Sequence, residues 1–374
     1  MFLPLMPFAG IGLYYRTGSE TLLAVPLLIV YILIPVLDRV FGSDINNPPE
    51  EIVPQLEEDR YYRRLTSITA PLHYLTLIAL AWFVAREDLS AWSVLVVAIT
   101  AGAFSGLGIN TAHEMGHKKT RWERWLAKVV LAIPAYGHFC VEHNRGHHRY
   151  VATPGDPASA RMGESIYKFA LREIPGCFRR GWTVESERLK RRDQATWSLH
   201  NEILQSYLGS LILQGGLIFA FGWIMLPFLM VHNFWAWFQL TSANYIEHYG
   251  LLRGKDLNGQ YERCQPHHSW NANYTFSNVV LFHLERHSDH HANSSRRYQS
   301  LRNFDDIPEL PNGYFGMYLI AYIPWLWYRV MNKRLLSLPH IQGDLNKVNI
   351  DPDKLGLIYE KYGDRQVVPG SAIT

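Results

Sequence analysis

Long runs of apolar residues, separated by segments that carry most of the charge, constrain this chain more than any other feature. A bilayer core is about 30 Å thick and needs about 20 apolar residues in a helix. Five stretches approach or exceed that requirement: residues 1–15, 22–37, 70–85, 91–112 and 208–243. A net charge of only +3 resembles that of a soluble domain. The clustering of the apolar residues nevertheless predicts an integral membrane protein.

The spacing of these runs predicts three helical hairpins. Gly18 and Ser19 form a tight turn between the first two runs, and residues 208–243 are long enough for two crossings with a turn at Gly222. The expected fold is therefore an all-α integral membrane protein with six transmembrane helices and a histidine-rich cytoplasmic region.

The charges indicate which side of the membrane each segment faces. With six spans, residues 41–66, 114–207 and 247–374 share one side, and basic residues are concentrated there, above all between Arg161 and Arg192. The positive-inside rule makes that side cytoplasmic. The three cysteines are widely spaced, form no CxxC pair and suit a reducing compartment. We expect the protein to lie in a bacterial inner membrane.

The predicted organisation has four parts. Residues 1–112 hold spans 1–4 with the cytoplasmic loop 41–66, residues 113–207 are cytoplasmic, residues 208–246 hold spans 5–6, and residues 247–374 are cytoplasmic. The aromatic-rich residues 314–328 are interrupted by Pro324, and a seventh crossing would place the polar C-terminal part outside. We therefore expect an interfacial helix there.

Histidine is unusually frequent, with 17 copies, and four histidine motifs fall on the predicted cytoplasmic side. The first motif, HxxxH, closes the fourth span, and its i,i+4 spacing places both rings on one helical face. The second, HxxxHH, repeats that spacing and adds an adjacent ring. An EHYG motif supplies one histidine, and HxxHH follows a helical i, i+3, i+4 pattern. The histidines of these motifs are His113, His117, His143, His147, His148, His248, His287, His290 and His291.

Imidazole at this density is typical of transition-metal sites. Nine rings exceed the roughly four to six ligands of one ion, so two ions are the simplest interpretation. A ligand set without cysteine or an obligatory carboxylate favours iron with open positions for O2. Glu114, between His113 and His117, also completes the HExxH motif of zinc proteases. That alternative leaves the other motifs unexplained. Soluble di-iron carboxylate bundles are excluded because they need two Glu-x-x-His motifs.

The four motifs resemble those of the membrane-bound non-haem di-iron family of alkane monooxygenases, fatty acyl desaturases and xylene monooxygenases. Residues 47–55, 244–251 and 283–291 are similar to alkane 1-monooxygenases in particular, and the resemblance extends from about Gly18 to about Ile350. It implies that the nine histidines bind two iron ions and that a linear alkane is hydroxylated at its terminal carbon with O2. A xylene-type alkyl oxidation and fatty acyl desaturation are the alternatives.

The resemblance also implies an electron donor, rubredoxin, which an NADH-dependent rubredoxin reductase reduces. Rubredoxin binds its iron through two CxxC pairs, which this sequence lacks, so we expect the donor to be a separate protein or a domain outside this sequence. The basic surface formed by Arg179, Arg180 and residues 188–192, or the basic patch at residues 118–121, would attract an acidic donor. They would equally attract anionic lipid head groups. No nucleic-acid partner is expected.

An unactivated methyl group has no leaving group, acidic proton or polar handle, so the chemistry must come from the metal centre. The protein must guide the chain end to that centre, and candidate corridor residues are Val30, Tyr31, Trp235 and Phe238. Ligating imidazoles usually donate their second N–H to a carboxylate. The candidates for that role are Glu114, Glu142, Glu247, Glu285, Asp289 and Asp156, followed by Asn110 and Asn244.

Overall fold

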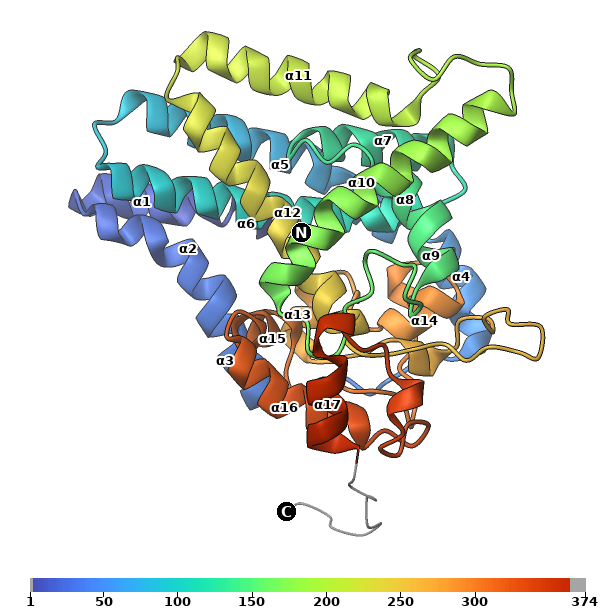
Figure 1. The fold of residues 1–374 in the computed structure, drawn as a ribbon. Coiled ribbons are helices and arrows are strands. Elements are labelled where there is room, and N and C mark those ends of the chain that lie inside the picture. The colour runs from blue at the N-terminus through green and yellow to red at the C-terminus, as the bar shows by residue number, and fades with distance from the viewer. Residues whose placement is uncertain (1–2, 364–374) are drawn as a thin grey trace.

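The computed structural model describes residues 3–363 as a helical protein (Figure 1). Within that range the backbone forms helices and isolated β-bridges but no β-strand, so the prediction of an all-α fold is confirmed. The α-helices are α1 (Pro7–Thr17), α2 (Val25–Leu28), α3 (Ile34–Phe41), α4 (Val53–Glu58), α5 (Arg60–Arg86), α6 (Ala91–Gly116), α7 (Arg121–Ala132), α8 (Phe139–Glu142), α9 (His148–Tyr150), α10 (Ile166–Lys190), α11 (Glu202–Phe221), α12 (Met225–His248), α13 (Thr275–Val280), α14 (His287–Ala292), α15 (Tyr314–Ala321), α16 (Pro324–Leu336) and α17 (Leu355–Tyr362). The shorter helical turns are η1 (Leu3–Leu5), η2 (Glu20–Ala24), η3 (Ile29–Leu33), η4 (Glu50–Ile52), η5 (His143–His147), η6 (Pro266–His268), η7 (Tyr298–Ser300), η8 (Leu345–Lys347) and η9 (Pro352–Lys354).

Four helical segments are long and apolar enough to cross a membrane, and they coincide with the second to fifth predicted spans. They are Glu20–Phe41, Arg60–Arg86, Ala91–Gly116 and Glu202–Phe221. The first predicted span corresponds to α1, whose 11 residues extend only about 16 Å. The sixth corresponds to α12, which has 24 residues but includes more polar side chains. The structure thus indicates a membrane protein, and the full count of six crossings stays a prediction.

The turns between the paired helices gather at one end of the bundle (Figure 1). The Glu20 carboxylate at the start of η2 accepts hydrogen bonds from the backbone N–H and the hydroxyl of Ser90, which precedes α6. Gly222 ends α11 with a φ of 84°, a left-handed conformation that glycine adopts without strain. Because α6 and α12 both run away from these turns, their C-terminal ends with His113 and His248 lie at the opposite end.

Two glycines allow α6 and α12 to pack closely. A Cβ atom on Gly102 would lie 2.7 Å from the carbonyl oxygen of His232, and one on Gly106 would lie 2.8 Å from Cβ of Gln239. Any larger residue would therefore force the helices apart. Small residues at i,i+4 spacing are typical of close helix contacts in membranes. This contact positions the two helices that carry the HxxxH and EHYG motifs.

Residues 314–328 do not form one continuous helix. Pro324 begins α16, and the preceding segment forms the separate helix α15. Tyr314, Phe315 and Tyr318 of α15 are buried, and the helix packs against α12 and η3. The first half of the predicted interfacial helix is therefore part of the core. A location of the second half at the membrane interface stays a prediction.

Candidate metal centre and its cavity

Nine histidines meet in two groups near the C-terminal ends of α6 and α12. Cluster one contains His113, His117, His143, His148 and His290, and cluster two contains His147, His248, His287 and His291. Within each cluster the candidate ligand nitrogens all lie within 4.8 Å of one another. These are the nine histidines singled out in the sequence. The tertiary structure adds that these histidines divide into one cluster of five and one cluster of four.

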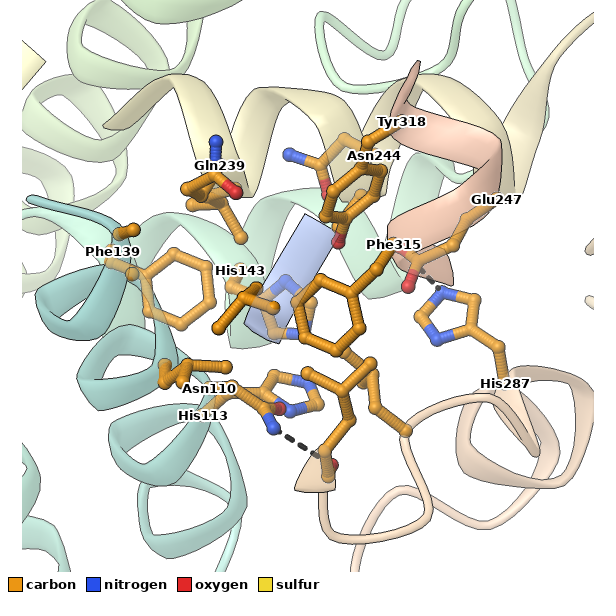
Figure 2. A pocket seen from close by; sticks show the side chains of 18 of the residues that line it. Asn110, His113, Phe139, His143, Gln239, Asn244, Glu247, His287, Phe315 and Tyr318 are labelled. Atoms are coloured by element: carbon orange, nitrogen blue, oxygen red, sulfur yellow. Dashed lines mark hydrogen bonds and ion pairs between the residues drawn. The ribbon is translucent and has the colours of Figure 1, made fainter. Parts of the chain in front are cut away.

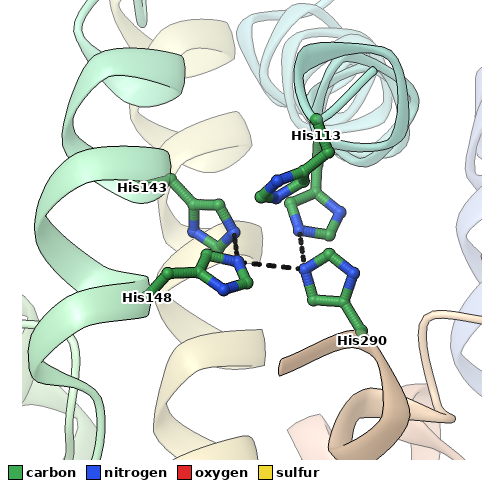
Figure 3. Close-up of side chains that lie close together, drawn as sticks. His113, His143, His148 and His290 are labelled. Atoms are coloured by element: carbon green, nitrogen blue, oxygen red, sulfur yellow. Dashed lines mark hydrogen bonds between the residues drawn. The ribbon is translucent and has the colours of Figure 1, made fainter. Parts of the chain in front are cut away.

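Cluster one is assembled from three parts of the chain, as Figure 3 shows for four of its rings. His113 and His117 lie one turn apart at the end of α6, in agreement with the predicted i,i+4 pair. The Nε2 atom of His113 is 3.0 Å from Nε2 of His290 on α14. The Nε2 atom of His148 lies 3.1 Å from Nε2 of both His143 and His290.

The HxxxHH motif at residues 143–148 does not place its side chains as an α-helix would. In an α-helix His143 and His147 would face the same side. The chain instead forms a π-helical turn, η5, over His143–His147. As a result His143 pairs with His148 in cluster one, while His147 belongs to cluster two. Such turns occur mostly at functional sites.

Helix α14 contributes histidines to both clusters. His287 and His291 lie one turn apart on the face of α14 toward cluster two, with 2.9 Å between their Nε2 atoms. The Nε2 atom of His287 is also 3.3 Å from Nε2 of His248. His290 projects from another face of the same helix into cluster one. The HxxHH spacing therefore serves both clusters.

The donor groups fit metal ions. Two nitrogens bound to one ion at about 2.1 Å lie about 3.0–3.4 Å apart, which matches separations of 2.9 to 3.3 Å here. The Nε2 atoms of His117 and His147 are buried and have no hydrogen-bond partner among the described residues. Burial lowers the pKa of His143, His148 and His291 well below its usual value, so these rings are neutral, as ligation requires.

Among the predicted carboxylates, Asp156 hydrogen-bonds a cluster histidine. The contact is made by the ring nitrogen that lies away from the candidate metal site. Oδ2 of Asp156 lies 2.9 Å from Nδ1 of His147 and accepts a hydrogen bond of 2.6 Å from the Ser159 hydroxyl. Its Oδ1 accepts a hydrogen bond of 2.7 Å from Arg180. Burial alone would raise the pKa of Asp156, but His147 and Arg180 lower it well below its usual value. The ionised carboxylate thus holds the His147 ring in one orientation.

Three other predicted carboxylates bind cations, so the prediction that they hydrogen-bond a cluster histidine is wrong within the described residues. A basic side chain lies close to each, and a buried carboxylate is costly without such a partner. The pairs are Glu114 with Lys118 (2.9 Å), Glu142 with Arg180, and Asp289 with Arg302 (3.0 Å).

Glu285 and the two asparagine candidates also bind groups outside the clusters. Glu285 accepts hydrogen bonds from two backbone N–H groups, Asn110 donates to the carbonyl of Leu281, and Asn244 donates to Glu173. Glu247 differs from all of these, since its Oε2 lies 3.3 Å from Nε2 of His287.

A cavity reaches both clusters (Figure 2). His113 and His143 of cluster one and His287 of cluster two contribute to its wall. Val30 and Tyr31 also line it, as expected for corridor residues. Much of the remaining wall is apolar, with side chains from α6, α12, α15 and the segment after α13.

Trp235 and Phe238 do not line this cavity, so their assignment to the corridor is corrected. Phe238 stacks on Tyr322 with 5.4 Å between ring centroids, and Trp235 packs against Phe238. Successive helical residues differ by about 100° in direction, and α12 presents another face to the cavity. The wall residues that sequence reasoning missed are Ala103, Gly106, Leu107, Phe139, Gln239, Leu240, Ala243, Leu281, Leu284, Phe315 and Tyr318. They come from separate elements and share no motif.

A basic groove leads from the surface to cluster one. A hollow is lined by His117 and by basic side chains that include Lys119 and Arg145. It shares Arg145 with an adjoining hollow that extends to Arg188 and Arg192. Residues 118–121 and 188–192, which belong to the two candidate docking surfaces given by the sequence, thus line adjoining hollows.

Comparisons with known proteins agree with these features. Residues 90–327 match the fatty acid desaturase family. The chain is 50% identical over 361 residues to alkane 1-monooxygenase 1 of Alcanivorax borkumensis and 52% identical over 360 residues to alkane 1-monooxygenase of Ectopseudomonas oleovorans. Each alignment covers 96% of this chain and 89% of the relative. The hydroxylase component of xylene/toluene monooxygenase from Pseudomonas putida is 27% identical over 226 residues, 59% of this chain and 58% of its own.

Proposed function

Because the chain belongs to the alkane 1-monooxygenase family, we propose that it hydroxylates the terminal carbon of linear alkanes with O2. The observation that carries this proposal is the cavity whose wall includes His113, His143 and His287. A substrate without polar groups binds through burial of its surface, which contributes up to about 0.8 kcal/mol per methylene. A cavity that also touches the histidine clusters would hold one end of such a chain beside the metal.

In this proposal each cluster holds one iron ion. Bound iron with open positions supplies O2 activation and C–H oxidation, which amino-acid side chains cannot perform. The chain's own residues keep water out of the cavity and hold the alkane end against the histidines. Asp156 keeps the His147 ring oriented with Nδ1 toward the carboxylate.

The alternatives have weaker support. The chain is much less similar to the xylene/toluene enzyme than to the alkane monooxygenases. Desaturation rests on the family match alone. For a zinc protease, Glu114 would have to act as a general base, but its carboxylate is paired with Lys118 at 2.9 Å and accepts the backbone N–H of Tyr298. Cluster one also contains five histidines, which is more than the three protein ligands of a catalytic zinc ion.

We also propose that rubredoxin, reduced by an NADH-dependent reductase, delivers the electrons at the basic groove. The groove reaches His117, so a docked acidic donor would come close to cluster one. Complementary charge accelerates such encounters and makes them sensitive to ionic strength. A fall in the reduction rate of the enzyme with rising salt would support this docking site.

For the membrane, we propose six crossings with both clusters on the cytoplasmic side of a bacterial inner membrane. The shared location of the three hairpin turns supports this arrangement (Figure 1), as does the basic character of the surface near the clusters. Residues 113–207 and 247–363 would then form the cytoplasmic part, and residues 208–246 the fifth and sixth spans.

One experiment tests the proposed function. Purified protein is assayed for iron per chain and then for turnover of octane, dodecane, hexadecane and xylene with rubredoxin, rubredoxin reductase and NADH. We expect two iron ions per chain and 1-alkanols as products. A single zinc ion in active protein, or products formed from xylene alone, would contradict the proposal.

A further inference from the structure

Glu247 and Asp156 each contact one cluster histidine, but they contact different nitrogens of the imidazole ring. Asp156 hydrogen-bonds Nδ1 of His147, the position from which a carboxylate orients a ligand. Glu247 instead places Oε2 3.3 Å from Nε2 of His287. That same Nε2 atom lies 3.3 Å from Nε2 of His248 and 2.9 Å from Nε2 of His291. Glu247 therefore sits on the side where the cluster-two nitrogens converge.

The other polar atoms of Glu247 and His287 support this difference between Glu247 and Asp156. Nδ1 of His287, which an orienting carboxylate would contact, has no hydrogen-bond partner among the described residues. Oε1 of Glu247 is also buried without a partner there, and the residue is only 2% exposed. A buried carboxylate without a compensating partner is costly. Figure 2 shows Glu247 directed toward His287 at the edge of the cavity.

We infer that Glu247 is the fifth protein donor of cluster two. Cluster one would then offer five nitrogens, and cluster two four nitrogens and one carboxylate oxygen. This inference rests on the proposed di-iron function. Because carboxylate is a harder ligand than imidazole, the two iron ions would differ electronically. Glu247 also lines the cavity, so the mixed site would border the substrate.

Tyr314 offers the alternative explanation for this carboxylate. Its buried hydroxyl lies close to Glu247 and is placed to donate a hydrogen bond to that carboxylate. If Glu247 served only to bind this hydroxyl, removing the hydroxyl would have the same effect as removing the carboxylate. The variants Glu247→Ala and Tyr314→Phe therefore separate the two roles.

The test measures metal binding and not turnover. The full-length wild type and the variants Glu247→Ala, Glu247→Gln, Tyr314→Phe and Glu173→Gln are loaded with 57Fe(II), titrated for two-site binding and examined by Mössbauer spectroscopy. Glu173 is a matched control, since it is a buried carboxylate that contacts Thr241 and Asn244 of α12 rather than a cluster histidine. Glu247→Gln preserves the side-chain volume and decides the question if Glu247→Ala does not fold.

We expect two quadrupole doublets in the wild type. Both Glu247 variants should bind one ion more than about tenfold more weakly, since even indirect partners of ligands contribute tenfold or more, and should change one doublet only. Tyr314→Phe and Glu173→Gln should keep both ions and both doublets. Unchanged doublets and affinities in the Glu247 variants, or an equal effect of Tyr314→Phe, would overturn the inference while leaving the di-iron proposal intact. A wild type that binds fewer than two iron ions would overturn both.

Discussion

Nδ1 of His147 lies 2.9 Å from Oδ2 of Asp156, and this contact leaves Nε2 of the same ring buried and without a hydrogen-bond partner among the described residues. Asp156→Asn keeps the shape of the side chain and removes its charge. We expect the affinity for iron to fall about 10-fold to 100-fold, as for other partners of metal-ligating histidines. Iron retained during dialysis against a chelator measures the effect. Glu187→Gln, at an exposed position on α10, is the control, and equal iron loss in both variants would contradict this role.

Arg180 connects two buried carboxylates, Glu142 and Asp156. Arg180→Ala leaves both without their cation, which should destabilise the protein by about 3–5 kcal/mol at neutral pH. The midpoint of thermal unfolding measures this loss. Arg179→Ala, at the exposed neighbouring position, should have little effect.

The stability deficit of Arg180→Ala should also depend on pH. Arg180 lowers the pKa of Asp156, so the wild type keeps this stabilisation at neutral pH and loses it only below the usual carboxylate range. Without the guanidinium the pKa of both carboxylates rises, and protonation then removes the unpaired charges. The difference in unfolding midpoint between variant and wild type should therefore shrink from pH 8 to pH 5. A deficit that grows on acidification would exclude this explanation.

The close contact of α6 and α12 can be tested at Gly102. Alanine there would place Cβ 2.7 Å from the carbonyl oxygen of His232, and such overpacking costs about 1–3 kcal/mol. Gly215→Ala on α11 is the matched control because nothing lies within 4 Å of its Cβ position. There, the higher helix propensity of alanine should be neutral or stabilising. We expect Gly102→Ala alone to lower both the unfolding midpoint and the iron content.

Val30 is buried in the cavity wall and is the residue expected to limit alkane length. Val30→Trp should shift turnover toward shorter alkanes without changing the iron content, since each methylene that no longer fits loses up to about 0.8 kcal/mol of burial. The wild type should accept chains of roughly twelve carbons or more. Competition assays with octane, dodecane and hexadecane measure the shift. Val36→Trp, at an exposed position on α3, should keep the wild-type profile, and the same profile in Val30→Trp would place the limit elsewhere.

The membrane orientation can be tested with single cysteines. Native Cys177 is buried and would not react from either side. Asp88→Cys, in the turn between α5 and α6, and Asn258→Cys, in the loop after α12, both replace exposed residues. In intact cells an impermeant maleimide should label Asp88→Cys only, and permeabilised cells should label both. Labelling of Asn258→Cys from outside would place the clusters on the wrong side for a cytosolic donor.

The sequence by itself determined the features that depend on local pattern. Apolar runs identified the helices that match four candidate spans, and the spacing of His113 and His117 placed both rings on one helical face. The same motifs identified all nine histidines of the two clusters. These properties follow from helix periodicity and from the shortage of other roles for so many imidazoles.

Only the tertiary structure decided which groups meet. The π-helical turn placed His143 and His147 in different clusters, and α14 distributed its histidines between both clusters. Asp156 binds His147 while Glu142 binds Arg180, which lies 38 residues further along the chain. The rotation of α12 placed Gln239 rather than Phe238 in the cavity wall. Hydrophobic pattern does not specify helix rotation inside a bundle whose surroundings are also apolar, so close packing at Gly102 and Gly106 makes that decision.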